Sequence, residues 1–118
     1  MSTQDIASDL VALCKQGRFS EAGEKYWAED VVSVEAMPGD MHEMQGKQAV
    51  RGKGDWWARN NEIHSVEVDG PYVNGDQFVV HYKMDVTPKH DGGRRTMDEI
   101  GVYTVRGDKI AEERFFSS

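Results

Sequence analysis

The last third of the chain alternates apolar and polar side chains with a period of two. Its apolar positions are Phe78, Val80, Tyr82, Met84 and Val86. Successive side chains of a strand point to opposite faces, so this pattern predicts a strand with one face against the core. Glycine-containing turns at residues 91–93 and 106–108 separate it from two further predicted strands, at 97–105 and 109–116. Three neighbouring long strands of this kind can pair as an antiparallel sheet without a crossover helix.

The N-terminal third shows helical spacing instead. Ile6, Leu10 and Cys14 recur every four residues and form one apolar stripe. We expect this helix to begin after a cap at Ser2 or Thr3 and to end at Gly17. A second helix is expected from a cap at residue 20 to about residue 27, and the valine-rich segment 30–36 reads as a short strand.

The middle of the chain predicts a loop, a third helix and one more strand. Residues 37–45 contain three methionines, a proline and no steady period, which favours a loop that folds over another part of the protein. Helical spacing resumes at 46–61, and residues 63–68 read as a strand that leads through the turn at 74–76 into the next. The predicted order is helix, helix, short strand, helix and four long strands.

Composition and charge narrow the class of protein. A chain of 118 residues supports one domain, spanning 1–118. The net charge is −7 and the lysines and arginines form no stripe, so nucleic acid and anionic membranes are poor partners. The single cysteine, Cys14, excludes an internal disulfide, and the N-terminus shows no signal peptide. Both features predict a cytoplasmic protein.

Four short segments carry a family resemblance when they are taken in order. They lie at residues 17–19, 27–32, 46–52 and 102–110. Together they resemble the SnoaL-like branch of the nuclear transport factor 2 superfamily, over nearly the whole chain. The resemblance implies a cone-shaped α+β fold, in which three N-terminal helices pack on the concave face of a curved antiparallel sheet around a pocket. The superfamily contains isomerases, cyclases, dehydratases, hydrolases and binding modules, so the fold does not select the function.

Strand parity predicts which side chains line the pocket. Glu35, Glu99 and Glu113 all fall on inward faces. Apolar surroundings raise the pKa of a carboxyl, and neighbouring acids titrate at different pH, as general acid–base chemistry requires. We expect Glu35, Glu99 and Tyr103 to be catalytic. The expected substrate-binding residues are Trp27, Met37, Trp56, Tyr82, Met84, Glu113 and Phe115. The alternative is that the glutamates lie hydrated at the rim or pair with arginines.

The ketosteroid isomerases of this superfamily match only in part. Counting five residues from Asp30 puts Glu35 where those enzymes have their general base, an aspartate. Their oxyanion tyrosine falls at Leu10 and their second acid at Gly101. Without such donors a dienolate lacks the stabilisation that usually dominates this catalysis. The resemblance therefore argues against steroid isomerisation and leaves proton transfer at a different carbon acid open.

Two functions remain open at this stage. One is a cofactor-independent isomerase, cyclase, dehydratase or hydrolase that uses Glu35 as acid/base on a small hydrophobic molecule. The other is a non-catalytic ligand-binding or accessory module with the same pocket. The four histidines lack metal-binding spacing, so we expect no metal. We also expect a homodimer, because an apolar set alternates with the inward one on the outer face: Val79, Ile100, Val102 and Phe116.

Overall fold

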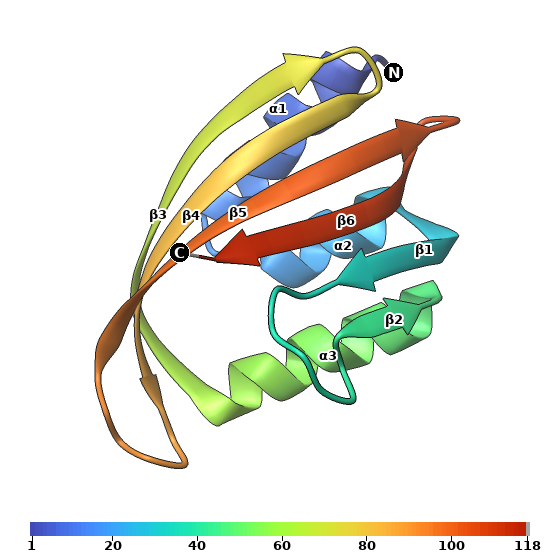
Figure 1. The fold of residues 1–118 in the computed structure, drawn as a ribbon. Coiled ribbons are helices and arrows are strands. Elements are labelled where there is room, and N and C mark those ends of the chain that lie inside the picture. Colours follow the sequence, from blue (N-terminus) through green and yellow to red (C-terminus); the bar gives the residue numbers. More distant parts are fainter. Residues whose placement is uncertain (118) are drawn as a thin grey trace.

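The structure, a computed structural model, describes residues 1–117. These residues form three helices and six strands that belong to one sheet (Figure 1). In chain order the elements are α1 (Thr3–Lys15), α2 (Phe19–Tyr26), β1 (Trp27–Val34), β2 (Glu43–Gln45), α3 (Lys47–Asn60), β3 (Asn61–Asn74), β4 (Gln77–Pro88), β5 (Arg95–Arg106) and β6 (Lys109–Ser117). The predicted α+β fold with a curved sheet is therefore confirmed.

The sheet is mixed rather than wholly antiparallel. Its strand order is β2-β1-β6-β5-β4-β3, and the pair β1–β6 is parallel while every other pair is antiparallel. The local pattern of apolar residues predicts strands but not which strands pair, so the parallel pair could not be predicted from the sequence. The register of β3 against β4 shifts twice, once at Gly70, whose φ of 133° suits glycine. Such irregularities bend a sheet, and Figure 1 shows the long strands bowing outward.

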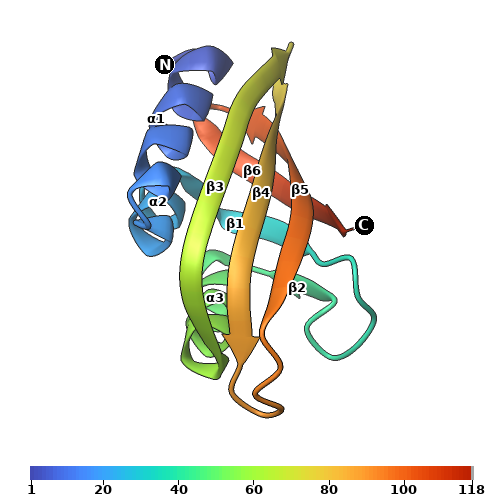
Figure 2. The same ribbon diagram turned by 90° about the vertical axis from the view of Figure 1, so that its left-hand side faces the viewer.

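The helices cover one side of this sheet and build the core with it. Figure 2 shows α1, α2 and α3 on the same side of the strands. The apolar stripe of α1, which includes Ile6 and Leu10, packs with Phe78 and Val80 of β4 in one buried cluster. Ser2 caps α1 in a capping box with Asp5, which accounts for the sharp start of the helix. The first helix thus covers β3 and β4, while α3 packs chiefly against β1 and also contacts β2 and β3.

Three local predictions were wrong at element ends. The second helix begins at Phe19, so Ser20 lies inside it and does not cap it. The first strand begins at Trp27 rather than residue 30, directly after α2 ends. The expected loop at 37–45 contains the short strand β2, which pairs with β1 through Ser33 and Met44. Three residues are too few to show a period of two, and tertiary pairing decides their structure.

Candidate functional site

A buried carboxylate joins two neighbouring strands, β1 and β6. Glu113 of β6 is 6% exposed. Its Oε1 accepts a hydrogen bond from Trp27 Nε1 and its Oε2 accepts one from Ser33 Oγ, both at 2.7 Å. Burial raises the pKa of Glu113, and the two donated hydrogen bonds act in the opposite direction. Glu113 therefore holds both the start and the end of β1 to β6.

Lys53 of α3 reaches into the same group. Its side chain is 10% exposed, and its Nζ lies 2.8 Å from Glu35 Oε1. The ammonium also donates a hydrogen bond to Ser33 Oγ and lies 5.8 Å from the centroid of the Phe115 ring. Glu35 follows the last residue of β1, where its backbone N–H donates to the carbonyl oxygen of His42 at 2.7 Å. The base expected from sequence thus carries a cationic partner.

Glu99 of β5 is the third carboxyl of the site. Burial raises its pKa from 4.5 to about 7, with further contributions from the charges of Glu35 and Glu113. The charge of Lys53 lowers the same pKa. At neutral pH this carboxyl is therefore divided between its protonated and ionised forms, which suits a group that gives and takes a proton.

Two tyrosines close the inner end of the site. The hydroxyl oxygens of Tyr82 and Tyr103 lie 2.6 Å apart, and Cys14 Sγ lies 3.9 Å from that of Tyr82. Burial raises the pKa of both phenols well above 10 and that of the Cys14 thiol to about 11. The Tyr103 ring stacks on Phe78 with its centroid 4.8 Å away. These groups stay protonated at neutral pH, so the phenols are hydrogen-bond donors and the thiol is not a nucleophile.

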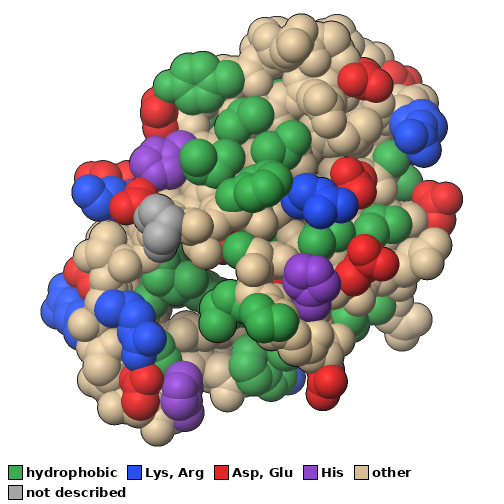
Figure 3. Space-filling model, in the orientation of Figure 1, with side chains coloured by type: hydrophobic (Ala, Val, Ile, Leu, Met, Phe, Trp, Pro, Cys, Tyr) green, Lys and Arg blue, Asp and Glu red, His purple; other side chains and the backbone are tan. Residues whose placement is uncertain are grey.

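A cavity of about 350 Å³ opens at Glu35. Its walls come from β1 and β6 and from the segment after β1: Val34, Glu35, Ala36, His42, Arg114, Phe115, Phe116 and Ser117. Figure 3 shows the molecule hollowed between the C-terminal end of β6 and α3, with hydrophobic side chains on the walls. Glu35 and Phe115 line the cavity and also contact Lys53, so the cavity communicates with the carboxylate group. A small ligand that enters here meets an apolar wall and a carboxylate.

Comparison with known proteins identifies the family. The family model of the SnoaL-like domain matches residues 1–117. The chain belongs to this family. A solved structure from Mesorhizobium loti, a candidate SnoaL-like polyketide cyclase, is 53% identical, with a TM-score of 0.97 over 98% of this chain and 99% of the other. None of the curated proteins matches the chain.

More distant structures share the fold of this SnoaL-like chain. A candidate isomerase from Bacillus subtilis is 16% identical, with a TM-score of 0.80 over 100% of this chain and 90% of that protein. A candidate SnoaL-like polyketide cyclase from Jannaschia is 14% identical, with a TM-score of 0.75 over 99% and 87% of the two chains. At these identities the likeness shows the fold alone, and it agrees with the resemblance inferred from the sequence.

Most side chains predicted for the site of this SnoaL-like chain lie together, and two lie apart. Six of them are buried or pack on the buried cluster: Trp27, Tyr82, Met84, Tyr103, Glu113 and Phe115. Glu35 lines the cavity, and Glu99 interacts electrostatically with Glu35, Lys53 and Glu113. Met37 is 72% exposed and Trp56 44% exposed. Met37 sits in the segment between β1 and β2, where no period indicates a direction. An adjacent tryptophan pair on a helix points two ways, and Trp56 is the one turned outward.

Lys53 is the site residue that the sequence analysis missed. The glycines on either side of it are similar to those of a phosphate loop, but their spacing from Gly46 is one residue too long. A usable signal lay three residues earlier, because Val50 is the buried residue of α3 and positions three apart share a helix face. Among residues 1–117, no arginine forms a salt bridge with Glu35, Glu99 or Glu113. Arg94 pairs with Asp85, and Arg114 lies 3.6 Å from Glu112.

Two positions that the sequence comparison matched to donors of the ketosteroid isomerases, Leu10 and Gly101, carry no polar side chain. A Cβ at Gly101 would lie 2.9 Å from Tyr103 Cε2 and 3.1 Å from both Phe115 Cε1 and the Tyr103 hydroxyl oxygen. The phenol and the Phe115 ring thus fill the space next to the position of the second acid. Leu10, at the position of the oxyanion tyrosine, is buried in the core. The polar groups of this site come from other positions, two of which, Glu99 and Tyr103, lie on the same strand as Gly101.

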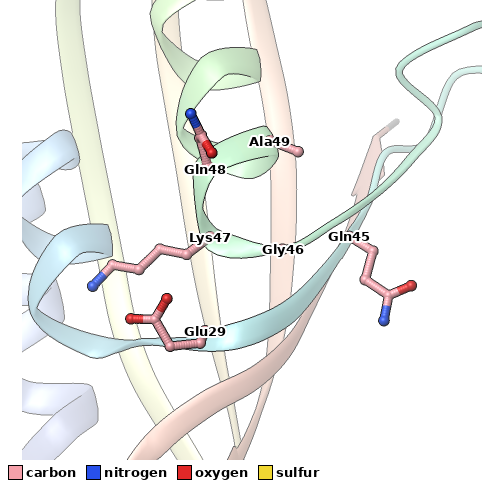
Figure 4. A pocket seen from close by; sticks show the side chains of 6 residues that line it. All are labelled: Glu29, Gln45, Gly46, Lys47, Gln48 and Ala49. Carbon is pink, nitrogen blue, oxygen red and sulfur yellow. The ribbon is translucent and has the colours of Figure 1, made fainter.

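A second hollow, of about 500 Å³, lies at the start of α3. It is lined by Glu29, Gln45, Gly46, Lys47, Gln48 and Ala49 (Figure 4). In Figure 4 the long side chains of Gln45 and Lys47 point in opposite directions, and Lys47 donates to the carbonyl oxygen of Glu24. Groups that diverge in this way do not converge on one ligand, so the hollow is not assigned a role.

Residues 1–117 contain neither a metal-binding cluster nor a helix that could span a membrane. Within residues 1–117 no three or more histidine, cysteine, aspartate or glutamate side chains are grouped so that they could hold a metal ion. In the same described part of the chain, no helix has the length and apolar character needed to cross a membrane.

Proposed function

We propose that this SnoaL-like protein is an acid–base enzyme of the isomerase or cyclase type that acts on a small hydrophobic carbon acid. Membership of the family supports a small-molecule-binding or isomerase/cyclase-type role. The observation that carries the proposal is that two carboxyl groups of one site have different surroundings. Glu35 faces an ammonium group at 2.8 Å, whereas Glu99 has its pKa raised to about 7 by burial. Proton transfer in two directions requires two titratable groups whose environments differ, so that one can accept a proton while the other donates one.

The proposed reaction divides the work between these two groups. Glu35, at the wall of the cavity, takes a proton from the carbon next to a carbonyl group. The electron pair of the broken C–H bond moves onto the carbonyl oxygen, where protonated Glu99 or a phenol such as Tyr103 donates a hydrogen bond. Return of the proton from Glu35 to a second carbon completes an isomerisation. The balance requires neither an oxidant nor a reductant, and we propose no cofactor.

Hydrogen exchange tests this proposal without knowledge of the natural substrate. 2-Tetralone, a small hydrophobic ketone, is incubated with the protein in D2O, and NMR follows the loss of its α-proton signal. We expect Glu35→Gln to slow the protein-dependent exchange by about a hundred- to ten-thousand-fold, because a general base is removed. Glu67→Gln, the same change at an exposed position of β3, is the matched control and should leave the rate unchanged.

The same exchange experiment distinguishes the enzymatic function from a second candidate, a non-catalytic binding module. The burial of Leu10 and the filling of the space at Gly101 favour a non-catalytic binding module, because the usual oxyanion donors are replaced. A binding module would broaden or shift the 2-tetralone signals in a saturable way while the α-protons exchange only at the buffer rate. That result contradicts the enzymatic proposal.

The proposed partner is a small hydrophobic molecule rather than a macromolecule. The net charge of −7 opposes nucleic acid and anionic membrane surfaces. We also propose a cytoplasmic location, supported by the single cysteine of the sequence, which is a buried free thiol.

A further inference from the structure

Lys53 is a nearly buried lysine at the meeting point of three carboxyl groups. It lies in the middle of α3, and its Nζ is paired with Glu35 at 2.8 Å. The ammonium donates to Ser33 Oγ, and Ser33 donates in turn to Glu113. Lysine is almost never buried to this degree unless it is paired, and burial of its charge costs free energy. An apolar side chain would fill the same volume without this cost.

The carboxyl groups around Lys53 come from three strands or their ends. Glu35 follows β1, Glu99 belongs to β5 and Glu113 to β6. At the cavity next to Glu35 lie His42 and Arg114, both at its exposed side. The charge of Lys53 stabilises the ionised forms of Glu99 and Glu113, and each of these glutamates is destabilised by the charge of Glu35. Lys53 is therefore the cation that offsets the mutual repulsion of three acids.

We propose that Lys53 is the positioning residue of this site: it fixes the Glu35 carboxylate at the cavity wall and joins it, through Ser33, to the buried Glu113. The inference rests on the proposed function in that Glu35 is the base. Glu35 follows the end of β1 in a segment without regular structure, so its backbone alone does not fix its side chain. The contact from α3 does so, and the continuous path Glu35–Lys53–Ser33–Glu113 makes the two carboxyls one electrostatic unit.

Titration of the carboxyl groups tests this role without a substrate. The side-chain carboxyl signals of Glu35, Glu99 and Glu113 are followed against pH by carbon-detected NMR in wild type, Lys53→Met and Lys53→Arg. Methionine keeps most of the volume and removes the charge. We expect the Glu99 midpoint to rise by on the order of one pH unit in Lys53→Met and to stay near the wild-type value in Lys53→Arg. A lysine that only fills space predicts no change in either variant.

Lys47→Met is the matched control. Lys47 lies on the first turn of the same helix and pairs with Glu24, away from the site. Its removal changes the net charge by the same amount and should leave all three midpoints unchanged. Lys53→Gln, which keeps a donor toward Ser33 but no charge, replaces the methionine variant if the latter does not fold. Unchanged midpoints in a folded, uncharged Lys53 variant overturn the proposal.

The exchange of 2-tetralone separates this inference from the proposed function. If wild type does not exchange the probe, acid–base catalysis is rejected while the titrations still decide the electrostatic role of Lys53. If wild type does exchange it, Lys53→Met should slow the exchange and Lys53→Arg should restore most of the rate, because a cation at this position holds the Glu35 carboxylate at the cavity wall. An unchanged exchange rate in Lys53→Met overturns the positioning role alone.

Discussion

At the scale of single residues, Glu99 makes the stability of the protein depend on pH. Its pKa rises from 4.5 to about 7 because the carboxyl is buried beside other acids. Between these values the folded state binds more protons than the unfolded chain, so the free energy of unfolding falls as the pH rises through this window. We expect Glu99→Gln, which cannot ionise, to exceed wild type in stability above pH 7 by on the order of 1–3 kcal/mol.

Urea unfolding at about pH 5 and about pH 8 measures this difference. The exposed Glu67→Gln serves as the control and should follow the wild-type pH dependence. Equal pH dependence of wild type and Glu99→Gln would contradict the assignment.

The inward direction of a side chain was predictable from the sequence where a strand supplied a period of two. Alternation alone indicated that Glu99, Tyr103 and Glu113 point inward, since each lies in a strand with a clear apolar set. It did not extend to Met37, which lies in a segment without a period, or to Lys53, which lies on a helix with a single buried residue. For these two positions the direction of the side chain is decided by packing.

At the scale of elements, a glycine in α2 makes room for the site. A Cβ on Gly23 would lie 2.4 Å from the Trp27 indole, whose Nε1 donates to Glu113. We expect Gly23→Ala to push the indole away and to lower the free energy of unfolding by about 1–3 kcal/mol, the usual cost of overpacking. Glycine usually weakens a helix, but Gly23 is required here because the Trp27 ring occupies the space where a side chain would lie.

Gly52→Ala is the matched control for this prediction. Gly52 lies in α3, is exposed, and has no atom near enough to meet a new Cβ. The same substitution should raise the free energy of unfolding there by about 0.4–1 kcal/mol, because alanine loses less backbone freedom on folding. Both values come from urea denaturation, and changes of the same sign in the two variants would contradict the steric argument.

Elements with a long run of regularly spaced apolar residues were predictable from the sequence, whereas features that depend on pairing with distant strands were not. The three helices and the strands β4, β5 and β6 follow from spacing alone, with ends displaced by a few residues. The short strand β2 and the parallel pairing of β1 with β6 depend on partners far away in the sequence. No local pattern contains that information.

At the scale of the whole molecule, we propose that the protein forms a homodimer through the outer face of the sheet. Val79 is opposite Val102, and Ile100 is opposite Phe116, so their side chains form one patch across β4, β5 and β6. Phe116 is 52% exposed, and Figure 3 shows hydrophobic side chains gathered over these strands. An apolar face of this kind is buried at low cost by a two-fold copy of itself.

Sedimentation of the wild type and Phe116→Asp tests the dimer. At tens of micromolar, roughly the range in which modest interfaces hold, wild type should sediment at twice the 13.3 kDa chain mass and the variant as a monomer. Met37→Asp introduces the same charge at another exposed apolar residue and should remain dimeric. A monomeric wild type, or a dimeric Phe116→Asp, would contradict this interface.

The parallel pair β1–β6 also has a consequence for how the chain acquires its site. Ser33 and Glu113 are 80 residues apart, and the hydrogen bond between them closes a loop that contains α3 and the four other strands. Closing a long loop costs entropy before any contact repays it, so contacts of this kind slow folding. A chain emerging from the ribosome holds Glu35 and Lys53 long before Glu113 and Phe115 exist. The pocket is therefore assembled only after synthesis has passed β6, as one of the last events of folding.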